Sequence, residues 1–254
     1  MDRRVLNDDF NELRTHPGRP KRKPQQSARL TYPYGRHSES EYLNAIKHKT
    51  VIIVGPAGYL QGQGKGAWID SFDLVARVNH AIPIAFPEDY GSRTDVLYHI
   101  LSHRGDNHKK ICDRKEIETW RDHGLKWLIS RHTAVSKRVR DMGPIINGAF
   151  PWACMHHVFY GKLKQAIGSK TPNTGISAIM HMLSVPIKSL TITGFDLYQT
   201  GVYPGYGDVQ EGEDPRKVND IHHDVDAQIE YLVRVIKRDN RIHIDDHLKE
   251  VLGL

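Results

Sequence analysis

Short runs of apolar, often β-branched residues alternate with longer amphipathic stretches from residue 51 to the end of the sequence. The short runs predict strands because they have the length and residue types of buried strands, and the longer stretches have the period of helices. The expected strands are Val51–Val54, Leu74–Val78, Asp95–Leu101, Leu125–Ser130, Ser189–Gly194 and Arg241–Ile244. The expected helices are Asp113–His123, Ala134–Met142, Met155–Ile167, Thr174–Val185, Ile221–Arg238 and Asp246–Val251. This alternation predicts an α/β fold with a mainly parallel sheet flanked by helices.

Length and composition narrow the class of protein. The 254 residues, 39% of them hydrophobic and 26% charged, suffice for one α/β domain or two small ones with a real core. No apolar run approaches the ~18 residues of a membrane span, and the N-terminus lacks the apolar segment of a secretory signal. Two cysteines without CxxC spacing favour a reducing compartment. We therefore expect a soluble cytoplasmic or otherwise intracellular protein without an integral membrane span.

Positive charge is concentrated at the N-terminus. Residues 1–36 hold nine Lys or Arg against four Asp or Glu, which accounts for +5 of the formal net charge of +6. Together with several prolines, this indicates a basic and flexible arm over residues 1–40, followed by a near-neutral domain over residues 41–254. Such an arm either binds a polyanion such as nucleic acid or serves as a solvated leader.

A glycine-rich turn follows the first expected strand, in VIIVGPAGYLQGQGKGAWIDSFDLVARVN from residue 51 to residue 79. Glycines that precede a helix start can bring backbone N–H groups close to a phosphate. A Walker A motif is excluded because Gly66, and not Ser or Thr, follows Lys65. A dinucleotide fingerprint through Gly62, Gly64 and Ala67 stays arguable, although these residues lie far beyond the strand end. Glycines that only form a turn are the remaining alternative.

A second phosphate-binding pattern is Pro172-Asn173-Thr174-Gly175 ahead of the apolar segment ISAIMHMLSV. Asn173 or Thr174 can cap this helix, and the N–H groups of its first turn then face a ligand phosphate. An ordinary capped helix is the alternative. Two helix starts at the carboxyl edge of one sheet would form a nucleotide-binding cleft.

Histidines and acids begin the expected helix after a long loop. Asp220, His222, His223 and Asp224 fall at its cap and first turn, where the helix N-terminus favours the neutral imidazole that a general base requires. Metal binding is less favoured, because adjacent histidines on a regular helix cannot both reach one metal and no HExxH spacing is present. Surface histidines without a role are the third possibility.

Taken in order, these signals resemble the motifs of the sialyltransferases, glycosyltransferase family 29. Residues 51–79 are similar to the long sialyl motif, and YGSRTDV at residues 90–96 is similar to the stretch that follows it. PNTGISAIMHMLSV with the downstream ITGFD resembles the short motif, and HDVDAQ from His223 resembles the very short motif. The similarity extends over about residues 50–240.

The resemblance implies a single Rossmann-like α/β domain, a sialyltransferase-like variant of the GT-A fold. It further implies an inverting transfer from a CMP-sugar without a metal or other cofactor. His223 would be the general base, which typically contributes about 10²- to 10⁴-fold to the rate. The positions that would contact the donor are Gly55, Gly58, Asn79, Thr174, Gly175, Gly194 and Phe195.

The sequence also departs from the family pattern. Pro56 stands at the position of an asparagine that reaches the donor phosphate, and Gln228 replaces the glutamate of the very short motif, for which Glu230 could compensate. The third motif has no clear counterpart. Further phosphate or acceptor contacts are therefore expected from Asn173, Tyr203, Tyr206 or His222.

Three functions remain open at this point. The first is transfer of sialic acid, or a related keto sugar such as Kdo, to a glycan or other hydroxyl acceptor. The second is transfer to a modified base of nucleic acid, with the same or another nucleotide-sugar donor, and the third is nucleotide binding without catalysis. The second would use the basic arm and a surface formed by His99, His103, Arg104, His108, Lys109 and Lys110. The four tryptophans, Trp68, Trp120, Trp127 and Trp152, are expected in the core more than as sugar platforms.

Overall fold

A computed structural model describes residues 39–103, 110–132, 136–146, 148–168, 170–199, 201–206 and 223–254. Seven strands lie in this part of the chain: β1 (Thr50–Val54), β2 (Leu74–Val78), β3 (Val96–His99), β4 (Trp127–Ser130), β5 (Trp152–Cys154), β6 (Ser189–Thr193) and β7 (Ile242–Ile244). The helices of its first half are α2 (Glu39–Ala45), η1 (Gly58–Leu60), α3 (Gly66–Asp70), α4 (Pro87–Tyr90) and α5 (Arg114–Asp122). Those of its second half are α6 (Lys137–Ile146), α7 (His157–Ile167), α8 (Thr174–Leu183), α10 (Val225–Arg238) and α11 (Asp246–Leu252).

The strands form one sheet in the order β5-β4-β3-β2-β1-β6-β7, and every neighbouring pair is parallel. The chain builds outward from β1 through β5 and then crosses to the other side of β1 to add β6 and β7. This reversal between β1 and β6 is a topological switch point, and ligands of open α/β sheets bind outside the carboxyl ends of the strands at such a point. The single α/β domain with a parallel sheet is confirmed for the described residues.

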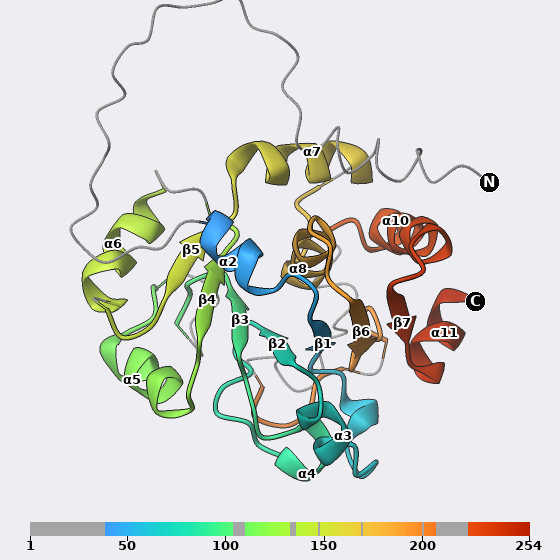
Figure 1. Ribbon diagram of the computed structural model, residues 1–254, viewed down its shortest axis with the longest axis horizontal. Coiled ribbons are helices and arrows are strands. Elements are labelled where there is room, and N and C mark those ends of the chain that lie inside the picture. The colour runs from blue at the N-terminus through green and yellow to red at the C-terminus, as the bar shows by residue number, and fades with distance from the viewer. Residues whose placement is uncertain are drawn as a thin grey trace, which may run out of the picture.

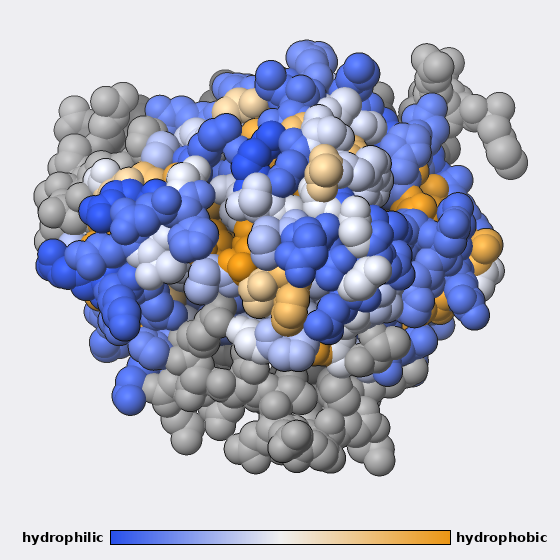
Figure 2. All heavy atoms as spheres, turned by 90° about the horizontal axis from the view of Figure 1, so that it is seen from below, coloured by the Kyte–Doolittle hydropathy of each residue, from blue (hydrophilic) through white to orange (hydrophobic). Residues whose placement is uncertain are grey.

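Helices cover both faces of the sheet (Figure 1). One face packs on α2, α7, α8 and α10 through a large cluster that includes Ile53, Tyr98 and Ile179. The other face carries two smaller clusters, one under α5 and α6 and one under α3 and α4. On the side where α3 and α4 lie, the surface is mostly hydrophilic, with a small apolar patch near its centre (Figure 2).

All six expected strands form, with ends that differ by at most two residues. β5 was not expected, because Trp152–Cys154 is only three residues long and lacks a β-branched run. The short helices α2 and α4 were also not expected, whereas α3 lies after the glycine-rich turn, where a helix start was expected. The first turn of α10 differs from expectation as well: Asp224 is its N-cap and the helix begins at Val225, so His223 precedes the helix.

The start of α2 bears on the expected division of the chain at residue 40. Glu39 opens this helix, and its Oε1 lies 2.7 Å from the backbone N of His156 and 2.8 Å from Nε2 of His181. Residue 39 is therefore part of the folded domain, while residues 1–38 of the expected basic arm lie outside the described residues. Among the described helices, none combines the length and apolarity required to cross a bilayer.

Candidate functional site

The carboxyl ends of β1 and β6 meet so closely that only glycine fits. A Cβ on Gly55 would lie 2.2 Å from the carbonyl oxygen of Gly194, and a Cβ on Gly194 would lie 2.4 Å from that of Gly55. Gly194 also has a φ of +72°, which disfavours residues with side chains. The ring of Phe195 lies against both Gly55 and Gly175, at 2.8 and 2.5 Å from their ideal Cβ positions. Four of the expected donor-binding residues therefore form one packed unit at the switch point.

The N–H of Gly55 is occupied within this unit, since it donates to the carbonyl of Thr193 at 2.8 Å. The N–H of Gly58 likewise donates to the carbonyl of Gly201 at 3.1 Å. Both glycines lie at the expected edge, but these two N–H groups are used by the protein. Their contact with a donor stays a prediction that rests on close backbone approach.

The outer glycines of the turn have another role. Gly62 and Gly64 both adopt positive φ, and their N–H groups donate to the two carboxylate oxygens of Asp89 at 2.7 and 2.8 Å. These bonds hold the pKa of Asp89 below its usual range. A carboxylate of the protein therefore occupies the position that a pyrophosphate would need, so the dinucleotide fingerprint through Gly62 and Gly64 is wrong.

Asn79 follows the carboxyl end of β2. It has a φ of +47°, and its backbone N donates to the carbonyl of Tyr98 at 2.7 Å. Its side-chain Oδ1 is buried and has no hydrogen-bond partner among the described residues. A buried acceptor without a partner is costly to a fold, and the contact of Asn79 with a donor stays a prediction that this observation favours.

The N-terminus of α8 lies at the same edge. Asn173 is its N-cap, and its Oδ1 accepts from the N–H of Ile176 at 2.8 Å. No acceptor within the described part of the chain takes the N–H groups of Thr174 and Gly175. With the helix dipole, these N–H groups form a favourable site for a negatively charged oxygen.

His223 is held next to this helix start. Its Nδ1 lies 2.6 Å from the carbonyl oxygen of Thr171. A carbonyl only accepts, so Nδ1 carries the proton and the lone pair of the neutral ring is on Nε2. This is the tautomer in which Nε2 can accept a proton.

Gln228 connects the two helix starts. Its side chain is buried, its Oε1 accepts from the backbone N of Asn173 at 2.8 Å, and its Nε2 donates to the carbonyl of Asp224 at 3.1 Å. Gln228, at the position where the motif resemblance expects a glutamate, thus connects α10 to α8. Glu230, by contrast, is exposed and takes no such position.

The sequence analysis did not identify an arginine and two tyrosines beside this site. Arg131 follows β4, and its Nη1 donates to the hydroxyl of Tyr160 at 2.7 Å and to the carbonyl of Pro172 at 3.2 Å. Burial raises the pKa of Tyr198 to about 12, while hydrogen bonding from Asn173 and the charge of Arg131 oppose that shift. Arg131 could have been found from the sequence, because it directly follows a buried strand at the carboxyl edge of the sheet. Tyr198 could not, because it lies in an irregular turn.

The expected substitutes for the third motif are only partly described. Tyr203 is 4% exposed and packs against Tyr90, with ring centroids 4.6 Å apart, so it contributes to the core. The hydroxyl of Tyr206 donates to the carbonyl of Val78 at 2.8 Å, beside Asn79. His222 lies outside the described residues.

Two other expectations concern surface chemistry. His99 is fully buried, so it cannot belong to the expected nucleic-acid-binding surface, and residues 104–109 of that surface are not described. In the described part of the chain, one group has metal-ligand geometry: His103, Asp113 and Glu116. Asp113 and Glu116 already form the capping box of α5, so their proximity is explained by helix capping.

Comparison with known proteins agrees with the sequence motifs. The model of glycosyltransferase family 29 (sialyltransferase) matches residues 16–132. Sialyltransferase-like protein 2 of Oryza sativa subsp. indica is 38% identical over 52 residues, which are 20% of this chain and 13% of that protein. Type 2 lactosamine alpha-2,3-sialyltransferase of Homo sapiens is 26% identical over 121 residues, which are 41% of this chain and 37% of that protein. The chain thus matches well under half of the length of either relative.

Solved structures with a similar outline include a mammalian sialyltransferase, with a TM-score of 0.48, 16% identity and coverage of 96% of this chain and 86% of that one. Another is the sialyltransferase CstII from Campylobacter jejuni in complex with cytidine-5′-monophosphate, with a TM-score of 0.49, 14% identity and coverage of 82% and 85%. At these scores the two structures do not bear on function. The family match contains Gly55 and Asn79 but ends before Thr174 and His223. Over residues 16–132, this chain is similar to glycosyltransferase family 29, the sialyltransferases.

Proposed function

We propose that this protein is an inverting, metal-independent glycosyltransferase that moves a sugar from a CMP-sugar donor to an acceptor hydroxyl. The donor sugar is sialic acid or a related keto sugar such as Kdo. The proposal is carried by one observation: the two parts of the expected site that lie outside the family match, the start of α8 and His223, come together at the switch point. The relatives named above carry the word sialyltransferase in their names, and that is the support they give to the proposed class of donor.

His223 acts as the general base. Its Nδ1–H is directed to the Thr171 carbonyl, which fixes the ring orientation and the tautomer, and Nε2 takes the proton of the acceptor hydroxyl. The hydroxyl oxygen then forms a bond to the anomeric carbon from the side opposite CMP. The bond between that carbon and the phosphate oxygen breaks, and CMP leaves with the electron pair.

The leaving phosphate is stabilised by groups of the chain. The N–H groups of Thr174 and Gly175 supply donors that need no reorganisation, and the Arg131 guanidinium adds a positive charge near the same helix start. Asn79 Oδ1 accepts from a ribose hydroxyl. Because these groups meet the charge that develops on the phosphate, the proposed mechanism requires no metal.

The test is CMP release from CMP-sialic acid and from CMP-Kdo with a panel of glycan acceptors, in the presence of a chelator. His223→Ala should lower turnover by about 10²- to 10⁴-fold. His123→Ala is the matched control, because His123 is exposed and its Nδ1 also lies 2.8 Å from a backbone carbonyl, that of Thr119. A folded His223→Ala variant that keeps the turnover of the control would refute the general-base role.

A further inference from the structure

A cleft lies on the face of the sheet opposite α8 and α10. Thr191 of β6 is in register with Ile52 of β1 and with His243 of β7, so these three residues share one face. Helices α3 to α6 cover this face over the other strands, whereas Thr191 and His243 line a cleft of about 670 Å³. That volume is typical of a small-molecule site. The cleft is lined by Tyr59, Gln63, Lys65, Trp68, Phe72, Thr191, His243, Ile244, Asp245, Asp246 and His247.

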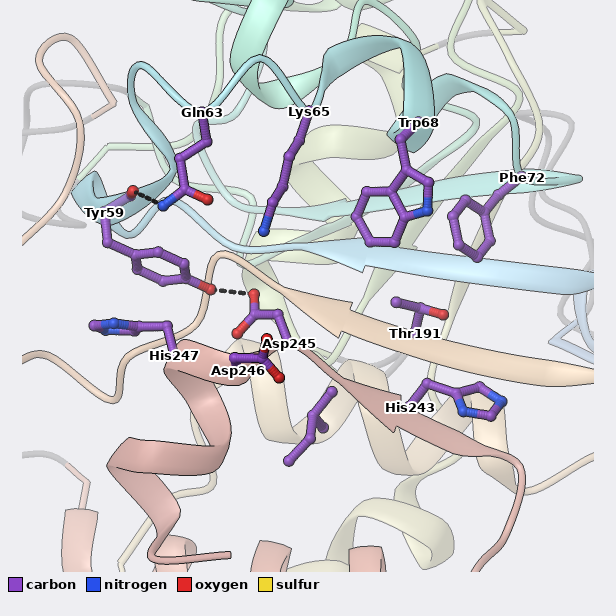
Figure 3. Close-up of a pocket in the computed structure, with 11 residues that line it drawn as sticks. Tyr59, Gln63, Lys65, Trp68, Phe72, Thr191, His243, Asp245, Asp246 and His247 are labelled. Carbon is purple, nitrogen blue, oxygen red and sulfur yellow. Dashed lines mark hydrogen bonds between the residues drawn. The ribbon is translucent and has the colours of Figure 1, made fainter.

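Trp68 presents an aromatic surface to this cleft. Its side chain is 43% exposed, and Trp68 and Leu254 are the two large hydrophobic residues that are exposed within the described part of the chain. Phe72 packs edge-to-face against the indole, with ring centroids 5.4 Å apart and an interplanar angle of 86°. The rings of Trp68 and Phe72 both point from the α3 side toward the strands (Figure 3). Trp120 and Trp152 are buried at 2% exposure each, so Trp68 is a departure from the expected core role.

Hydrogen-bonding groups face this aromatic wall. Gln63 and Lys65 point into the cleft from the same side as Trp68, and Asp246 faces them from the start of α11 (Figure 3). The Asp246 side chain is 97% exposed and pairs with Lys249 at 2.7 Å. Lys65 contributes to the low pKa of Asp246, after the hydrogen bond and charge of Lys249. The polar groups of Gln63 and Lys65 therefore lie on one side of the cleft and the Asp246 carboxylate on the other (Figure 3).

Asp245 shapes the cleft, and three donors of the protein bind its carboxylate. Its Oδ1 caps α11 through the N–H of Leu248, and its Oδ2 accepts from the hydroxyls of Tyr59 and Thr193. The hydroxyl of Tyr59 accepts in turn from the N–H of Gly194 at 2.7 Å. Tyr59 and Asp245 thus form a rigid wall that joins the cleft to the packed glycines of the switch point.

The lining selects against charged ligands. With His243 and His247 neutral, one lysine and two aspartates leave no excess of positive charge for a phosphate, and the acids are already paired or hydrogen-bonded. An aromatic face beside hydrogen-bond donors and acceptors suits a molecule with an apolar C–H face and a rim of hydroxyl groups. We propose that this cleft is a binding site for a neutral saccharide, which stacks on Trp68 and hydrogen-bonds to Lys65 and Asp246.

The test follows the indole N–H signals of the full chain by ¹⁵N-edited NMR. The chain has four tryptophans and so four such signals, and Trp68→Phe assigns the one of interest. Lactose, maltose and N,N′-diacetylchitobiose are titrated to about 20 mM, which nearly saturates a site with a Kd of about 1 mM. At least one disaccharide should shift the Trp68 signal saturably while the other three signals stay unchanged.

Variants then define the contact by calorimetry. Trp68→Ala should weaken binding of that disaccharide by about tenfold or more, and Asp246→Asn by about threefold to tenfold. Asp122→Asn is the matched control, because Asp122 is also an exposed, paired aspartate, with 65% side-chain exposure, and should bind as the unaltered protein does.

Three results would overturn the proposal. The first is that the Trp68 signal shifts with none of the sugars, and the second is that all four indole signals shift equally. The third is a Trp68 signal that moves with protein concentration alone, which would assign the cleft to a second copy of the chain. The measurement needs neither donor nor turnover, so its outcome is independent of the transferase proposal.

Discussion

Gln228 offers a direct test of how the two helix starts are held together. We consider Gln228→Met, which keeps the length of the buried side chain and removes its amide. The substitution leaves the backbone N–H of Asn173 without its acceptor at 2.8 Å. The carbonyl of Asp224 loses the side-chain bond but keeps the backbone N–H of Gln228 at 3.2 Å.

The expected cost follows from this difference. A buried donor left without a partner costs about 1 to 3 kcal/mol, whereas a carbonyl that keeps one of two bonds loses little. We therefore expect the free energy of unfolding to fall by about 2 kcal/mol. For a domain of this size, that corresponds to a decrease in Tm of about 4 to 8 °C.

Urea unfolding followed by circular dichroism measures this change. Gln61→Met is the matched control, because Gln61 is exposed and its substitution should change the stability by less than about 0.5 kcal/mol. Gln228→Met should also impair transfer, since Asn173 caps the helix that meets the phosphate. If the two variants were equally stable, the proposed connection between α8 and α10 would be wrong.

Three further predictions use the same unfolding assay or amide exchange. Gly194→Ala should destabilise more than Gly62→Ala by at least about 1 kcal/mol, because both residues have positive φ but only the Cβ at 194 meets backbone; equal losses would contradict the close approach. Burial raises the pKa of Asp95, but bonds from Lys126, Val75 and Arg93 outweigh this and keep the pKa below its usual value. Asp95→Asn should therefore be less stable than the unaltered protein at pH 7, and the difference should shrink as the pH falls below about 4; a constant difference would contradict this role. Asp89→Ala should speed amide exchange at Gly62 and Gly64, and unchanged exchange would show that Asp89 does not hold the turn.

Much of the fold follows from local pattern. Strands such as Leu74–Val78 are mostly apolar runs with β-branched residues, bounded by polar residues, so their position is readable from the sequence. The order of the strands is not, because the crossing from β5 to β6 on the far side of β1 depends on packing between distant segments. Strand β5 was missed because three residues carry too little pattern.

The candidate site likewise has residues that the sequence identified and residues that it did not. Asn79 and His223 were identified through motif resemblance, and the structure places Asn79 at the expected edge and His223 beside α8. The role of Asp89 could not be read from the sequence. Its carboxylate binds the N–H groups of glycines that lie 25 to 27 residues earlier in the chain, and no local pattern indicates this contact. The exposure of Trp68 was equally hidden, since it results from the absence of a helix over β6 and β7 on that face in the described part of the chain.

The central claim is that the switch point binds a cytidine nucleotide, and calorimetric titration with CMP, UDP and GDP in the presence of a chelator tests it most directly. We predict that CMP binds in preference to UDP and GDP. Asn79→Ala should weaken CMP binding by about tenfold, because the buried Oδ1 of Asn79 would accept from the nucleotide, whereas the exposed control Asn240→Ala should not. Equal affinity for the three nucleotides, or no binding of CMP, would contradict the account.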